Sequence, residues 1–152
     1  MAGEAGCGIH QGWLVPVAAR VNSKALACDA LLPVTSWLEL RSEFFTGEAL
    51  RGLGGGGIGQ NFTPLNEPLE TTGGWAQVNL RPGSMLRLGA GCGGDHPVTA
   101  STRHRNDACA AYAVLRPSGP LFFAAEFRRL RTGYSVGYFV NDHVTFGAGF
   151  EF

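Results

Sequence analysis

Charged side chains alternate with apolar ones in several segments of this sequence, and the alternation limits the chemistry they can do. Glu39, Arg41 and Glu43 occupy every second position of one apolar segment, and Glu126 and Arg128 repeat the pattern nearer the C-terminus. A charge within an apolar segment is costly unless it is paired or reaches water. We therefore expect these groups to face the inside of a hollow structure, where they either pair and fill it or line a water-filled space.

Histidines and aspartates near the expected loops are the candidates for catalysis. They permit a metal site, or a hydrolytic histidine acting with a serine, but their spacing is typical of neither. Solvated polar side chains at loop ends explain them without a site. These residues are His96, His104, His143, Asp95, Asp107 and Asp142. The glycine-rich segment 52–59 lacks the Gly-Lys-Ser/Thr of a phosphate-binding loop, so an external loop is expected there. We predict no enzymatic activity, no cofactor and no metal.

β-Strands are the elements that must position these side chains. Apolar and polar residues alternate with a period of two in five segments, which is typical of strands with one apolar face. Weaker patterns raise the count to eight, with the first two strands joined near Asn22 and Ser23. The expected strands are 13–21, 25–32, 37–45, 74–81, 85–92, 107–116, 121–130 and 143–152.

Composition excludes several classes of protein. Glycine is abundant, with 23 residues, and no segment has helical spacing, so a helical bundle is not expected. Twelve basic residues balance twelve acidic ones, and this gives no reason to expect a nucleic-acid partner. No apolar stretch reaches the roughly 18 to 20 residues of a membrane-spanning helix. A closed barrel of strands can nevertheless cross a membrane, because it satisfies every backbone group.

The expected connections alternate in length. Short ones rich in Pro, Gly and Ser occupy 33–36, 81–84 and 116–120, whereas long ones occupy 46–73, 93–106 and 132–142. Short turns on one side and long loops on the other are typical of a transmembrane barrel. We predict an all-β, antiparallel, transmembrane up-and-down β-barrel of about eight strands, which is either complete or the C-terminal part of a larger barrel. It forms a single domain over 1–152, and residues 1–24 have the weakest strand pattern.

Polar residues on one parity of these strands are predicted to face the lumen. In a barrel of eight strands they would pair and plug the interior, and in a wider barrel they would line water and set ion preference. Arg129 and Arg131 fall on the apolar parity, where they either reach lipid headgroups or are turned inward by a bulge. The predicted lumen-facing residues are Asp29, Glu39, Arg41, Glu43, Gln77, Asn79, Arg87, Glu126, Arg128 and Glu151.

Two other functions fit the alternation. One is a soluble lipocalin-like barrel that binds a ligand, for which the inward face should be apolar and the outward face polar. The other is an outer-membrane barrel enzyme acting on lipid or peptide, which requires a nucleophile and a base within hydrogen-bond reach.

Cys92 and Cys109 flank one expected loop, near the ends of adjacent strands. Outside the cytoplasm they can form a disulfide, and closing a loop of about 17 residues would stabilise the fold by roughly 3 kcal/mol in the chain-entropy model. The alternative is two small apolar residues that lie apart.

Four segments carry a resemblance to a known family: 47–50 with 52–56, 73–79, 126–132, and 141 to the end. The stretch from Glu43 to Phe152 resembles the C-terminal part of porin-like outer-membrane β-barrel proteins of bacteria. The resemblance implies a non-enzymatic channel or small barrel in the bacterial outer membrane, with the bilayer, its lipids and the barrel-assembly machinery as partners. Such families usually carry further strands upstream, which this sequence lacks. Export to the outer membrane requires a signal peptide, and none is recognisable at the N-terminus, so we expect a mature chain or the C-terminal piece of a longer protein. The terminal strand resembles an assembly signal, carried by Val144, Phe146, Phe150 and Phe152.

Overall fold

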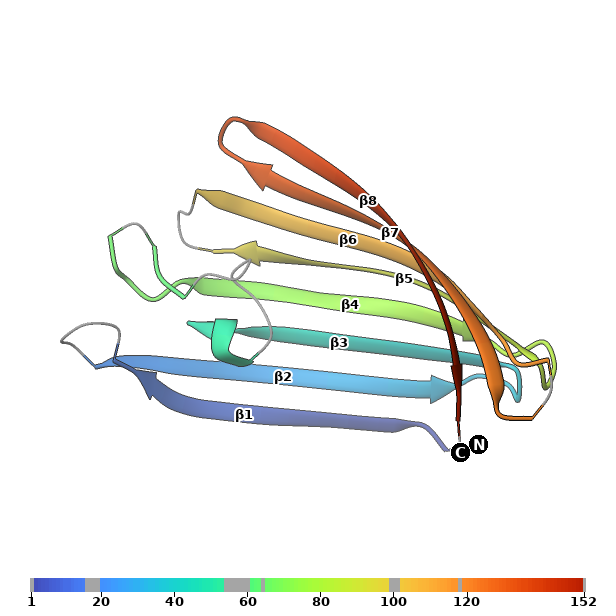
Figure 1. The fold of residues 1–152 in the computed structure, drawn as a ribbon. Helices are drawn as coiled ribbons and strands as arrows, with labels where there is room; N and C mark the ends of the chain where they lie inside the picture. The colour runs from blue at the N-terminus through green and yellow to red at the C-terminus, as the bar shows by residue number, and fades with distance from the viewer. Residues whose placement is uncertain are drawn as a thin grey trace.

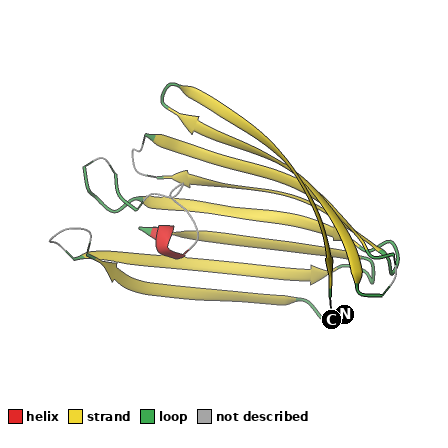
Figure 2. Ribbon diagram, viewed as in Figure 1, coloured by secondary structure: helices red, strands yellow, loops and turns green. Residues whose placement is uncertain are grey.

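Eight antiparallel strands form one sheet in the computed structural model, which describes residues 2–15, 20–53, 61–63, 65–98, 102–117 and 119–151. The strands follow one another in chain order, so each pairs with its neighbours in the sequence (Figure 1). Within the described residues, η1 (Leu50–Leu53), a turn of 3-10 helix, is the one helical element (Figure 2). The strands are β1 (Glu4–Leu14), β2 (Val21–Pro33), β3 (Leu38–Glu48), β4 (Glu70–Leu80), β5 (Leu86–Pro97), β6 (Arg103–Leu115), β7 (Leu121–Tyr134) and β8 (Gly137–Phe150).

The all-β class and the up-and-down order of eight antiparallel strands are confirmed, but the sheet is not closed. β1 and β8 form its two edges, and no pairing joins them among the described residues. Closure would require neighbouring strands about 4.8 Å apart. Figure 1 shows a curved sheet in which β8 and β1 diverge away from the chain ends, and its concave side is called here the hollow face.

The N-terminal strand lies earlier in the chain than predicted. β1 ends at Leu14, and Asn22 and Ser23 lie inside β2, opposite Trp13 and Gly12, rather than in a turn. The prediction was wrong because glycines interrupt the apolar alternation of residues 4–14, and glycine is depleted in strands. The predicted strands 13–21 and 143–152 include residues 16–19 and Phe152, which lie outside the described residues.

All three predicted long loops are shorter than expected, two of them by more than half. β5 continues to Pro97 and β6 begins at Arg103, while β7 and β8 are separated only by residues 135 and 136. Strand pairing therefore extends beyond the apolar part of each strand. Only the connection between β3 and β4 remains long, and the predicted glycine-rich segment falls largely on its residues 54–60, which lie outside the described residues.

The two ends of the sheet are distinct. The connections 34–37, 81–85 and 116–120 lie at one end, called here the turn end, and both chain termini lie there too (Figure 1). The connections after β1, β3, β5 and β7 lie at the opposite end, called here the loop end. The even number of strands places the two termini at the same end.

Candidate functional site: a polar hollow face and an apolar outer face

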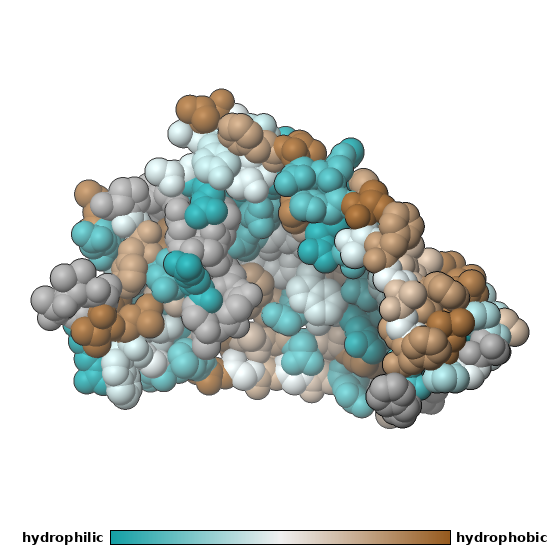
Figure 3. All heavy atoms as spheres, viewed as in Figure 1, coloured by the Kyte–Doolittle hydropathy of each residue, from teal (hydrophilic) through white to brown (hydrophobic). Residues whose placement is uncertain are grey.

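The strand register separates the side chains onto two faces. The hollow face carries Glu39, Asn79 and Tyr112, and the outer face carries Leu40 and Val78. Figure 3 shows hydrophilic side chains in the middle of the hollow and hydrophobic ones along the turn ends of β7 and β8. Nine of the ten residues predicted to face a lumen lie on the hollow face, and Glu151 follows directly after β8: Asp29, Glu39, Arg41, Glu43, Gln77, Asn79, Arg87, Glu126 and Arg128.

A polar cluster joins three strands on the hollow face near the turn end. Asn79 is only 7% exposed, and it donates from Nδ2 to Glu39 Oε1 over 3.0 Å. Its Oδ1 accepts hydrogen bonds from Gln77 Nε2 and, over 2.9 Å, from the Tyr112 hydroxyl. Arg41 Nε lies 2.6 Å from Glu39 Oε1. The carboxylate is therefore both paired and hydrogen-bonded, as a largely buried charge requires.

Tyr112 can reach Asn79 because the intervening strand has no side chain in its path. Gly89 of β5 lies between them, and a Cβ there would come within 2.2 Å of Tyr112 Cε1. The aromatic ring thus covers the glycine backbone. Sequence reasoning placed Asn79 on this face but missed Tyr112, whose position opposite Gly89 depends on the strand register.

Two further ion pairs lie on or beside the hollow face. Arg128 Nη2 contacts Glu126 Oε1 at 2.6 Å, within one strand. Arg116 and Glu151 form a two-point pair that ties the connection after β6 to the residue after β8, with Arg116 Nη2 donating to Glu151 Oε1 over 2.8 Å. The hydrogen bond from Arg116 holds the pKa of the Glu151 carboxyl below its usual range.

Part of the β3–β4 connection packs on the hollow face at the loop end. Leu50 and Leu69 are almost completely buried, and Ala49 N donates to Leu69 O over 3.0 Å. Ser23, on the hollow face of β2, donates to Ala49 O over 3.3 Å. A Cβ at Gly47 would come within 2.8 Å of Leu50 Cδ2, so this glycine lets the segment lie close to the sheet. Main chain as well as side chains therefore occupies the hollow.

The outer face is apolar and uncovered. Its side chains include Phe44 at 49%, Phe146 at 79% and Val144 at 63% exposure, and the described residues provide no layer that covers them. Buried apolar residues are confined to Ala49, Leu50 and Leu69 within the described chain. Large exposed apolar surfaces of this kind mark contact with a membrane or another protein.

One row of polar residues limits the apolar part of the outer face. Counted from the turn end, each of β2 to β8 has four or five outer positions that carry no charge, and then a charged residue or histidine. We call these residues the boundary row: Lys24, Glu48, Glu70, His96, Asp107, Arg129 and Asp142.

The boundary row crosses the strands obliquely. Lys24, Glu48 and Glu70 lie opposite one another, whereas from β4 to β7 each next member lies two positions nearer the turn end. From β2 to β8 the row therefore moves toward the turn end by about one residue per strand on average. With about 3.4 Å per residue and 4.8 Å between strands, the strands lie about 35° from the normal to the row. Strands of closed barrels tilt by about 35 to 45°.

Arg129 and Arg131 remain on the outer face. Arg129 makes a two-point ion pair with Asp142 at 2.7 and 2.8 Å, and Arg131 stacks on Tyr138 with its guanidinium carbon 3.9 Å from the ring centre. The β6–β7 register shifts only between Arg103 and Arg105, so no bulge turns the two arginines inward. Of the two interpretations of these residues, the outward one describes the structure.

The candidate histidines and aspartates are divided between the two faces of the sheet. His96 Nε2 lies 3.6 Å from Asp107 on the outer face, whereas His143 lies on the hollow face of β8. His104 contacts the edge of Tyr138. Across the described residues, no three His, Cys, Asp or Glu side chains are grouped as metal ligands. None of the described helical residues forms a helix long and apolar enough to span a membrane.

Two disulfides join adjacent strands on the outer face. Cys92 bonds to Cys109 between β5 and β6, which is the pairing considered from the sequence. Cys7 bonds to Cys28 between β1 and β2, and sequence reasoning missed it because β1 was misplaced.

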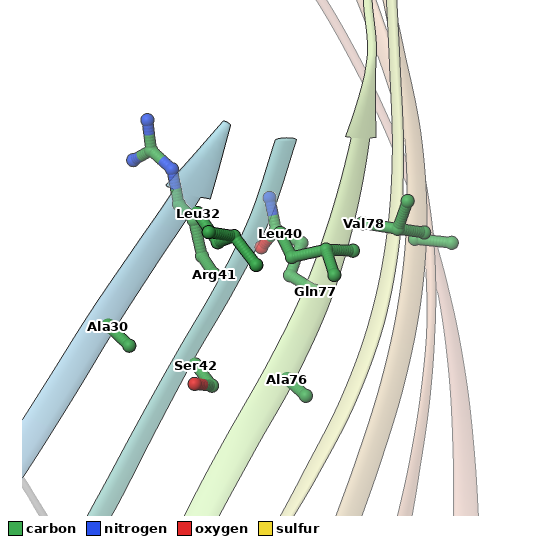
Figure 4. A pocket seen from close by; sticks show the side chains of 9 residues that line it. Ala30, Leu32, Leu40, Arg41, Ser42, Ala76, Gln77 and Val78 are labelled. Carbon is green, nitrogen blue, oxygen red and sulfur yellow. The ribbon is translucent and has the colours of Figure 1, made fainter. Parts of the chain in front are cut away.

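A shallow depression of about 510 Å³ lies on the outer face of β2 to β5. Small residues, including Ala30, Ser42 and Ala76, form its floor beside larger apolar ones. Figure 4 shows Leu40 on one side of the sheet and the Arg41 guanidinium on the other. The depression therefore offers mainly apolar contact, with Arg41, Ser42 and Gln77 as the polar residues of its lining.

Comparison with known proteins identifies no relative of this chain. No protein-family model, no curated protein and no solved structure matches this chain. The function must be inferred from the two faces of the sheet.

Proposed function

We propose that this sheet is part of the wall of a porin-like β-barrel in the bacterial outer membrane, with its outer face against lipid and its hollow face toward water. The chain is not an enzyme in this role, and it conducts small solutes along the hollow face. The observation that carries the proposal is the uncovered apolar outer face, limited by the boundary row.

The apolar part of the outer face between the turn end and the boundary row is called here the apolar band. Its height supports contact with a membrane rather than with a protein partner. The apolar part of each strand runs from its first outer residue at the turn end to its member of the boundary row. It is eight residues long in β7, from Leu121 to Arg129, and ten in β3, from Leu38 to Glu48. At a tilt of about 35° these lengths correspond to about 22 to 28 Å. The apolar band of outer-membrane barrels is about 25 Å tall.

The polarity of the two faces favours this function over a soluble ligand-binding barrel. A soluble barrel needs an apolar interior, whereas the hollow face here carries the polar cluster and the Glu126–Arg128 pair. Charged groups that line a wide lumen act on passing ions. The loop segment at Leu50 and Leu69 narrows the hollow from the loop end. Two disulfides also fit the oxidising space outside the cytoplasm.

Two neighbouring alanines of β7 test the proposal. Ala125 lies on the outer face opposite Phe146, and Ala124 lies on the hollow face opposite Gly147. Each is replaced by arginine, the chains are refolded from urea into lipid vesicles, and unfolding is followed by tryptophan fluorescence. We expect Ala125→Arg to lower the free energy of unfolding by about 2 to 4 kcal/mol, the cost of a lipid-facing arginine near the bilayer midplane.

Ala124→Arg is the matched control, because it adds the same side chain at the same depth on the other face. It should have a small effect if the hollow face meets water. Equal losses for the two variants, or wild-type chain that does not float with the vesicles, would contradict the proposal.

A further inference from the structure

The edge strands leave backbone groups unpaired in the part of the sheet that we place in lipid. β1 spans 11 residues and β8 spans 14, and within the part of the chain that the structure describes each pairs with one neighbour only. Nearly all of their residues are exposed. Hydrocarbon provides no hydrogen bonds to the N–H and C=O groups of an open edge, so open edges are not found in bilayers. Both edges therefore need partner strands.

The two edges of one chain are poorly suited to pair with each other. An eight-stranded barrel has an interior just wide enough for side chains. The hollow face also carries main chain, since η1 and residues near Leu69 pack against it. A barrel that encloses this segment must be wider than eight strands.

We propose that two copies of the chain close one sixteen-stranded barrel, with β8 of each copy paired to β1 of the other. The inference rests on the proposed membrane function. The directions are suitable, because β1 and β8 are antiparallel in an up-and-down sheet of eight strands. Two identical head-to-tail junctions give a closed ring with twofold symmetry.

Hydrogen-bonding groups match at such a junction. The Cα atoms of Cys7 and Cys28 are 4.1 Å apart, a separation typical of a non-hydrogen-bonded pair. The N–H and C=O groups of outer-face residues in β1, such as Ile9, therefore point to the free edge. Cys92 and Cys109 show the same separation, and alternation across β6 and β7 directs the groups of outer-face residues in β8, such as Val144, to the other free edge.

One register also matches the two surfaces. Placing Asp142 opposite Gln11 of the second copy continues the boundary row and puts Val144 opposite Ile9. All of β1 then lies within the length of β8. A shift of two residues in one direction places Glu151 opposite Glu4, and like charges opposite each other are unfavourable. The opposite shift places Asp142 beside Ile9 inside the apolar band.

Cysteine cross-linking of two single variants tests the junction. Ile9→Cys and Val144→Cys chains, one lengthened by a tag, are mixed in urea, refolded together into vesicles and oxidised. A hydrogen-bonded pair has Cα atoms about 5.5 Å apart, which a disulfide spans. We expect a covalent dimer of one long and one short chain, in which mass spectrometry finds residue 9 bonded to residue 144. His10→Cys replaces Ile9→Cys in the control, because it lies on the hollow face.

Each outcome decides the inference. The dimer at 9 and 144, with little cross-linking at 10 and 144, supports it. An Ile9→Cys, Val144→Cys double variant that forms the bond within one chain shows a barrel closed by a single copy and overturns it, as does the absence of any bond. A failed cross-link with normal membrane insertion refutes only the junction, whereas the arginine test on β7 refutes the membrane wall.

Discussion

Tyr112→Phe should weaken the sheet by breaking a bond that spans three strands. The hydroxyl reaches from β6 across Gly89 to Asn79 on β4, over 2.9 Å. A neutral hydrogen bond contributes about 0.5 to 1.5 kcal/mol net, so we expect Tyr112→Phe to lower the free energy of unfolding by that amount. Asn79→Ala should cost more, about 2 to 4 kcal/mol, because it also removes a donor from the Glu39 carboxylate, and bonds to charged groups contribute about 1.5 to 3 kcal/mol.

A double-mutant cycle separates the shared bond from the rest. Wild type, Tyr112→Phe, Asn79→Ala and the double variant are unfolded by urea in vesicles, and the coupling energy is taken from their four free energies. We expect a coupling of about 0.5 to 1.5 kcal/mol. Tyr134→Phe is a matched control, since it removes a tyrosine hydroxyl outside the cluster. Strict additivity of the two substitutions, or an equal loss in the control, would refute the argument that this hydroxyl links β6 to β4.

Three further predictions follow from contacts of the described chain. Gly89→Ala should displace the tyrosine ring above it and lower stability, whereas alanine at an open position such as Gly8 should not; the measurement is urea unfolding, and equal effects would argue against ring contact. Replacing Cys92 and Cys109 with serine should cost about 3 kcal/mol in the chain-entropy model, and free alkylation of both thiols in the wild-type chain would disprove the bond. The pKa of Glu151 is lowered in the folded chain, so its contribution to the free energy of unfolding is present above its unfolded pKa and is lost as pH falls through its folded pKa. Glu151→Gln should therefore flatten the acid side of a plot of the free energy of unfolding against pH. An unchanged plot would exclude a stabilising Arg116–Glu151 pair.

The period of two allowed the sequence to predict which side chains share a face. Glu39, Arg41 and Arg128 lie on the same face of the sheet because side chains alternate strictly along a strand, whatever its exact ends. Strand ends were harder to predict. Polar residues occur equally in loops and in strands beyond the apolar band, so β7 and β8 were shortened in the prediction although their pairing continues to Tyr134 and Gly137.

Two contacts that depend on strand register were not predicted from the sequence. The Cys7–Cys28 bond requires β1 and β2 to be aligned, and the glycines of β1 hid that strand. The reach of Tyr112 to Asn79 depends on which residue of β5 lies between them. Closure depends on the curvature accumulated over all strands, which no local pattern specifies.

The two disulfides each join strands that are adjacent in the sequence, and this affects how the chain can be assembled. Each disulfide forms within one hairpin, so it can form before that hairpin pairs with the other strands of the sheet. No bond connects distant strands among the described residues, and every strand pairs only with its sequence neighbours. Contacts between sequence neighbours form with little loss of chain entropy. A chain whose two disulfides have already formed can therefore assemble the sheet hairpin by hairpin, and neither disulfide has to be broken first.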